Sequence, residues 1–69
     1  MITLRVELEL EEDDRWIAEV PDLPGVMAYG ATQEEARARV QALALRVVAD
    51  RLENGEADSD LLNIAFQAA

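Results

Sequence analysis

The sequence predicts an α+β fold of order β-β-β-α-β, an antiparallel sheet covered on one face by one long helix. Three observations predict it: apolar and polar residues alternate near the N-terminus, prolines and glycines punctuate the segment that follows, and apolar residues then recur at helical spacing. A chain of 69 residues has room for one small domain, so we assign residues 1–69 to a single domain.

The first strand and its hairpin come from a repeat of period two. Residues 2–10, ITLRVELEL, alternate strictly between apolar and polar, which is typical of a strand with one buried face. Residues 16–20, WIAEV, continue the pattern as a second strand. The acidic run between them lacks the spaced ligands and the glycine of a calcium loop, so it favours a hairpin turn over a metal site.

The connection PDLPG follows the second strand. Pro21 has no N–H group and should end the strand pairing. Pro24 and Gly25 suit the centre of a type II turn, because glycine tolerates positive φ. We expect a stiff, protruding loop that holds Asp22 and Leu23 in a fixed pose.

A short third strand, VMAY at 26–29, leads to the helix. Thr32 and Glu35 form a capping box, in which Thr32 accepts from the N–H of Glu35 and Glu35 reaches back to the N–H of Thr32. The helix should run from about residue 33 to residue 53 and stop at Asn54-Gly55.

The predicted helix is apolar over more than one face. The first stripe should cover the sheet, and a second stripe lies a third to half a turn around the axis. That second stripe is either covered by the chain's own C-terminus or is a subunit interface. We predict self-association there, as a homodimer or a larger assembly. The first stripe is Ala36, Val40, Leu43, Ala44 and Val47; the second is Leu45, Val48 and Leu52.

The C-terminal segment 61–69, LLNIAFQAA, allows two interpretations. Leu62, Ile64 and Phe66 alternate with other residues, which indicates a final strand. A short helix capped by Ser59 is the alternative, because alanine and leucine favour helices.

Composition excludes several classes of function. The net charge is −9 and all six basic residues are arginine, so direct binding of nucleic acid is not expected. Such a chain is instead attracted to basic protein surfaces. A fold this small usually needs support, and with no cysteine or histidine that support should be another chain. The absence of a long apolar run predicts no membrane span, and we expect a cytoplasmic protein.

No catalytic group of residues can be assembled. The chain has no histidine base, no cysteine nucleophile and one serine, and its glycines match no phosphate-binding loop. We therefore expect no enzymatic activity, no cofactor and no metal.

Two motifs carry a family resemblance. D-D-x-W-I-A-E-V-P-D-L-P-G at 13–25 and G-A-T-x-E-E-A at 30–36 make residues 1–55 resemble the HicB family of antitoxins. The resemblance implies a partly degraded ribonuclease H-like fold that has lost its nuclease residues. Its distinctive positions are Pro21, Asp22, Leu23, Pro24, Gly25, Gly30, Thr32, Glu35 and Ala36.

The resemblance also implies a function and a partner. HicB antitoxins cover and inhibit HicA, a small basic toxin that cleaves messenger RNA with a catalytic histidine. Many of them add a C-terminal DNA-binding domain, for which this chain leaves no room, so autorepression is not expected. The alternative is a solitary self-associating structural or regulatory protein with no toxin.

The predicted partner-binding residues are Trp16, Asp22, Leu23 and Pro24. Trp16 and Leu23 are the expected apolar anchors and Asp22 a polar contact. A core position for Trp16, and a purely local role for Asp22 in its turn, remain open.

Overall fold

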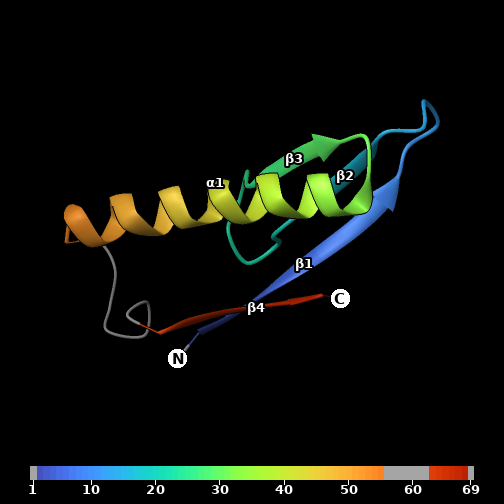
Figure 1. Cartoon of the computed structure of the whole chain (residues 1–69). Coiled ribbons are helices and arrows are strands. Elements are labelled where there is room, and N and C mark those ends of the chain that lie inside the picture. The colour runs from blue at the N-terminus through green and yellow to red at the C-terminus, as the bar shows by residue number, and fades with distance from the viewer. Residues whose placement is uncertain (1, 56–62, 69) are drawn as a thin grey trace.

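The computed structural model describes residues 2–55 and 63–68. The predicted order of elements is confirmed, and the helix packs on one side of the sheet (Figure 1). The elements are β1 (Ile2–Leu10), β2 (Trp16–Glu19), β3 (Met27–Gly30), α1 (Gln33–Glu53) and β4 (Ile64–Ala68).

The sheet is mixed, with the strand order β3-β2-β1-β4. β1 pairs with β2 and β2 with β3 in antiparallel fashion, as predicted, but β4 is parallel to β1. The expectation of a fully antiparallel sheet was wrong at this strand, because α1 carries the chain back to the end of the sheet where β1 begins (Figure 1). The strand interpretation of the C-terminal segment is confirmed for residues 64–68; residues 61 and 62 lie outside the described residues.

The register places the apolar residues of each strand under the helix. Leu8 lies opposite Ala18, and Ala18 lies opposite Ala28, so the apolar alternation of β1 continues across three strands. Burying this face under α1 supplies the main stabilisation of a fold without disulfides. The buried core is Leu4, Val6, Ala18, Val20, Leu23, Val26, Ala36, Val40, Ala44 and Val48.

Leu23 of the PDLPG loop points into the core, whereas Pro21, Asp22, Pro24 and Gly25 are exposed. The N–H of Val26 donates to the carbonyl of Leu23 at 3.1 Å, and Gly25 has φ +83°, so the predicted turn around Pro24-Gly25 is confirmed. A second bond, from the N–H of Val20 to the carbonyl of Val26 at 3.0 Å, closes the base of the loop. Leu23 is only 3% exposed and belongs to the core.

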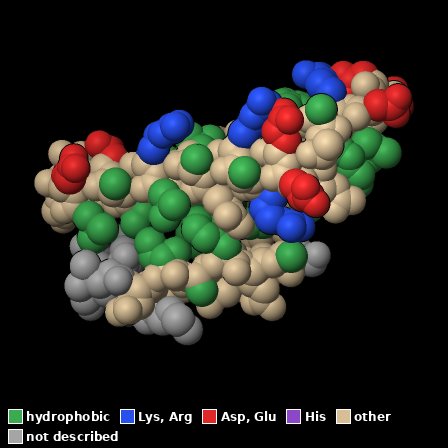
Figure 2. All heavy atoms as spheres, in the orientation of Figure 1, with side chains coloured by type: hydrophobic (Ala, Val, Ile, Leu, Met, Phe, Trp, Pro, Cys, Tyr) green, Lys and Arg blue, Asp and Glu red, His purple; other side chains and the backbone are tan. Residues whose placement is uncertain are grey.

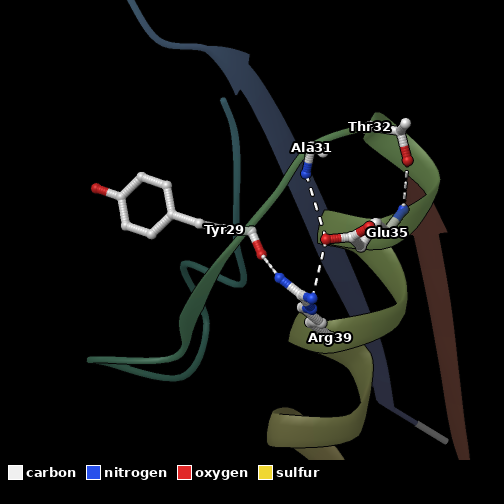
Figure 3. Close-up of polar contacts among 5 residues, drawn as sticks. All are labelled: Tyr29, Ala31, Thr32, Glu35 and Arg39. Carbon is white, nitrogen blue, oxygen red and sulfur yellow. Dashed lines mark hydrogen bonds and ion pairs between the residues drawn. The ribbon is translucent and has the colours of Figure 1, made fainter. Parts of the chain in front are cut away.

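Four polar contacts hold the start of α1, and one of them reaches β3 (Figure 3). Thr32 Oγ1 accepts from the N–H of Glu35 at 3.0 Å, as predicted. The Glu35 carboxylate accepts from the N–H of Ala31 at 3.3 Å, not from Thr32. It also pairs with Arg39 at 2.9 Å, and Arg39 donates to the carbonyl of Tyr29 at 3.0 Å.

Gly30 allows the helix to approach β3 this closely. A Cβ atom at Gly30 would lie within 3 Å of backbone atoms of Glu35 and Ala36. The first turn of α1 therefore rests directly on the last residue of β3, which fixes the direction in which the helix crosses the sheet.

Candidate protein-binding surface

The helix covers one face of the sheet, and the other face is turned away from α1. We call it the open face. Pairing in the sheet sets its members, because alternate residues of every strand point to it. They are Thr3, Arg5, Glu7, Glu9, Ile17, Glu19, Met27, Tyr29, Ala65 and Gln67.

Apolar side chains occupy the β2–β3 part of the open face. Ile17 lies opposite Tyr29, and Met27 lies opposite Glu19. Met27 is 43% exposed and Tyr29 is 41% exposed, which is high for side chains of this size. The ring of Tyr29 points away from α1 (Figure 3), so the helix does not cover it.

Carboxylates border this apolar part on the β1 side. Glu7 lies directly opposite Glu19, and Glu9 lies opposite Ile17. Neighbouring strands are about 4.8 Å apart, and like charges in directly opposite positions destabilise a sheet. Among the described residues, no basic side chain lies within 4 Å of these three carboxylates. The acidic side of the open face is therefore uncompensated within the described chain.

The same carboxylates line a hollow of about 280 Å³. Its walls are Glu7, Leu8, Glu9, Glu11, Ile17 and Glu19. No group of acidic residues in 2–55 and 63–68 converges closely enough to hold a metal ion. An apolar wall beside spaced carboxylates suits the aliphatic stem and charged head of an arginine or lysine side chain.

The β1–β2 hairpin closes one end of the open face. Arg15 stacks over the ring of Tyr29, with its guanidinium carbon 4.5 Å from the ring centroid. Its Nε also donates to Asp13 at 2.6 Å. The backbone N–H of Arg15, together with its guanidinium, lowers the pKa of Asp13 below its ordinary value. A second hollow, of about 530 Å³, lies between this hairpin, Glu9 and Tyr29.

The four predicted partner-binding residues do not form one surface. Leu23 is buried in the core and is not available as an anchor, because its turn directs the side chain under the helix. Trp16 is partly buried against the core on the helix side of β2, at the opposite end from the PDLPG loop. Asp22 and Pro24 are exposed, and Asp22 lies 3.8 Å from Arg5 of the open face.

The three predicted self-association residues do not lie on one surface either. Leu45 is 49% exposed and Leu52 is 38% exposed, whereas Val48 is 3% exposed and packs in the core. The assignment of Val48 to the self-association surface was therefore wrong. Val48 follows Ala44 by four residues and continues the stripe that faces the sheet.

Sequence reasoning missed the apolar part of the open face. The sequence did contain a sign of it. Ile17 lies on the opposite face of the strand from Trp16 and Ala18, and it shares that outward face with the acidic Glu19. The face of the short segment VMAY was undetermined because four residues carry too little periodicity. Only the register with β2 shows that Met27 and Tyr29 join Ile17.

Within the described ranges, no helix has the length and apolar character needed to cross a bilayer.

No curated protein and no solved structure matches the chain. One family model, described as UPF0150-like, matches residues 5–56, which include β1, β2, β3, the PDLPG loop and the whole of α1. The chain therefore belongs to the UPF0150-like family, a family of small HicB-like, antitoxin-type proteins.

Proposed function

We propose that this protein is an antitoxin-type binding module that inhibits a basic, messenger-RNA-cleaving toxin of the HicA kind by covering it with the open face. The observation that carries the proposal is the pairing of an exposed apolar area with carboxylates that have no basic partner within the described chain. Family membership and the net charge of −9 support it. No catalytic role is proposed.

The chemistry of the open face fits this kind of partner. A toxin that binds RNA must present cations to phosphates, and carboxylates at Glu7, Glu9 and Glu19 can engage the same cations. Rim charges of this kind mainly accelerate association, whereas buried apolar contacts slow dissociation. Ile17, Met27 and Tyr29 are therefore the anchors in this proposal, in place of Leu23.

A cleavage assay tests the proposal. A short reading frame beside the gene that encodes a basic, histidine-containing product supplies the toxin, and RNA cleavage is followed as this protein is added. Inhibition is expected to saturate at a fixed molar ratio. Cleavage that continues undiminished at excess of this protein would overturn the proposal.

A pair of matched variants locates the surface. Glu7→Gln/Glu19→Gln removes two charges from the open face, and we expect about tenfold weaker inhibition, mainly through slower association. Glu34→Gln/Asp50→Asn removes two charges from exposed positions of α1 and should leave inhibition unchanged. An equal loss in both variants would show that only net charge matters and would contradict the assignment to the open face.

The second candidate function is that of a solitary self-associating protein with no toxin. The exposure of Leu45 and Leu52 on α1 favours it. The two functions separate experimentally, because the second predicts assembly without any effect on RNA cleavage.

A further inference from the structure

β4 forms one margin of the sheet, because it is the last strand in the order β3-β2-β1-β4. α1 packs mainly on β3 and β2 and leaves β4 at the opposite margin (Figure 1). Among residues 2–55 and 63–68, no strand pairs with the side of β4 that faces away from β1. We call this side the β4 edge. A margin of this kind presents main-chain N–H and C=O groups that another strand can bind.

The pairing with β1 determines which main-chain groups lie on the β4 edge. The N–H of Ile2 donates to the carbonyl of Asn63 at 2.8 Å, and Ile2 lies opposite Ile64. In a parallel pair, this bond directs the main-chain groups of Asn63 and of every second residue after it toward β1. Those of Ile64 and Phe66 therefore point outward. A strand aligned with the β4 edge gains about four main-chain hydrogen bonds, two at each of these residues.

The other margin of the sheet, formed by β3, is covered by α1. The N–H of Val20 donates to the carbonyl of Val26, so the main-chain groups of Tyr29, three residues further on, point away from β2. Arg39 of α1 donates to that outward carbonyl at 3.0 Å. An incoming strand would have to displace this side chain. Within the described residues, no side chain makes a corresponding hydrogen bond to the β4 edge.

The β4 edge also lacks the sequence features by which proteins block such margins. Exposed edge strands are commonly interrupted by lysine, proline or a bulge. β4 reads IAFQA, without charge or proline, and it pairs with β1 at all five of its residues. In the view of Figure 2, the margin where β4 lies shows hydrophobic and uncharged atoms. This margin is therefore able to pair with a further strand.

We propose that a basic protein partner adds one of its own strands to the β4 edge. Charge favours this occupant over a second copy of the chain, because two copies with a net charge of −9 each repel one another. A strand beyond β4 lies two strand spacings from β1, roughly 10 Å. Lysine or arginine side chains on it extend toward Glu7 and Glu9 of β1, which have no basic partner within the described chain.

The β4 edge is continuous with the open face, because Ala65 and Gln67 of β4 belong to that face. A partner that covers the open face therefore reaches the β4 edge along the same sheet. That this partner is a toxin rests on the proposed function, whereas the strand-binding property of the edge does not. Side chains of the open face and main-chain groups of the β4 edge then hold the partner together.

Hydrogen exchange of the free protein tests whether the β4 edge is open. The amide hydrogens of Ile64 and Phe66 should exchange several-fold faster than those of Ala65 and Gln67, whose N–H groups face β1. NMR measures them together at two protein concentrations. Equal protection of all four amides at both concentrations would show that the edge is already covered. Protection of Ile64 and Phe66 that rises with concentration would assign the edge to a second copy, and either result would overturn the proposal.

A synthetic peptide supplies the added strand. A short peptide of alternating valine and arginine combines strand propensity with positive charge. Its control carries an N-methyl group on every central residue, which removes the main-chain donors and keeps the side chains and the charge. The unmodified peptide should slow exchange at Ile64 and Phe66 several-fold, and the control should bind at least tenfold more weakly. Equal binding of the two peptides, or binding of neither, would overturn the proposal.

Matched variants at one position locate the contact. Phe66→Pro removes an outward N–H and no bond to β1, so β4 should survive, as edge strands tolerate proline in this orientation. Phe66→Ala removes the same side chain and keeps the N–H. Phe66→Pro should bind the peptide several-fold more weakly than Phe66→Ala, and equal affinities would contradict main-chain pairing. Circular dichroism checks both folds. If Phe66→Pro unfolds, Ala68→Pro replaces it with the same expectation, because Ala68 is exposed and also outward in its main chain.

The RNA-cleavage assay separates this inference from the proposed function. Phe66→Pro should inhibit cleavage several-fold less strongly than Phe66→Ala. Full inhibition by Phe66→Pro would overturn the toxin's use of the β4 edge and leave the proposed function intact. Cleavage that the parent protein fails to inhibit would overturn the proposed function, and the exchange and peptide measurements would then decide whether the edge binds a strand.

Discussion

The two faces of the sheet are built by the same alternation and serve different ends. Under α1, Leu4, Val6 and Val20 are almost completely buried. On the open face, Met27 and Tyr29 remain more than 40% exposed beside carboxylates with no basic partner in the described chain. The covered face therefore supplies the stability of the fold. On the open face, Glu7 and Glu19 repel each other across paired strands, and this arrangement does not help the chain to fold.

The largest expected effect comes from shortening one large apolar side chain to alanine on each face of the sheet and comparing the losses of stability. Leu4→Ala should lower the free energy of unfolding by about 3 kcal/mol, because it leaves a cavity in a closed core. That is a large share of the roughly 4–10 kcal/mol available to a chain of this size. Ile17→Ala on the open face should cost less than about 1 kcal/mol. Urea denaturation measures both, and similar losses would erase the distinction between the faces.

The next largest effect concerns the approach of the helix to the covered face. Gly30→Ala should destabilise the protein by about 2 kcal/mol, since the new methyl group would overlap backbone atoms at the start of α1. Tyr29→Ala, one residue earlier on the open face, should cost less. Thermal unfolding followed by circular dichroism compares the two, and a neutral Gly30→Ala would show that α1 does not rest on β3 as described.

A smaller effect has the opposite sign. Glu7→Gln should stabilise the fold by about 0.5 kcal/mol, because it removes the repulsion from Glu19 across the β1–β2 pair. The same change should weaken toxin inhibition. A variant that is less stable than the parent would show that the carboxylate at position 7 has a favourable partner, and the functional interpretation of the acidic side would lose its support.

The smallest effect is a pH dependence at the hairpin. Bonds from Arg15 lower the pKa of Asp13 below its ordinary value of 3.8. The stabilising contribution is therefore fully present above pH 3.8 and is lost as the pH falls through the lowered pKa. Asp13→Asn should be slightly less stable than the parent at neutral pH, and the difference should vanish in acid. A difference that stays constant with pH would mean that the Asp13 charge contributes nothing.

Local signals were sufficient for most of the fold. The period of two in β1, the turn at Pro24-Gly25 and the Thr32 cap each depend on residues close in sequence, and each is found where it was predicted. The parallel placement of β4 and the burial of Leu23 depend on long-range packing, which local patterns do not encode. The return contact of the capping box was also misplaced by one residue, because the Glu35 carboxylate accepts from the N–H of Ala31.

The candidate site was harder to predict from the sequence than the fold was. Asp22 and Pro24 are exposed as a partner-binding role requires, but the open face is assembled from alternate residues of separate strands. No single stretch of the chain displays Glu7, Ile17 and Tyr29 together. Their meeting is a consequence of register, and register becomes known only when the strands are paired.

The most direct test of the central claim is an NMR titration of the labelled protein with a catalytically inactive HicA-type toxin. The claim predicts that the methyl signals of Ile17 and Met27 and the ring signals of Tyr29 shift or broaden on binding. Those of Leu23 and Leu45 should stay in place. Perturbation confined to the PDLPG loop or to α1, with Ile17 and Met27 unchanged, would contradict it.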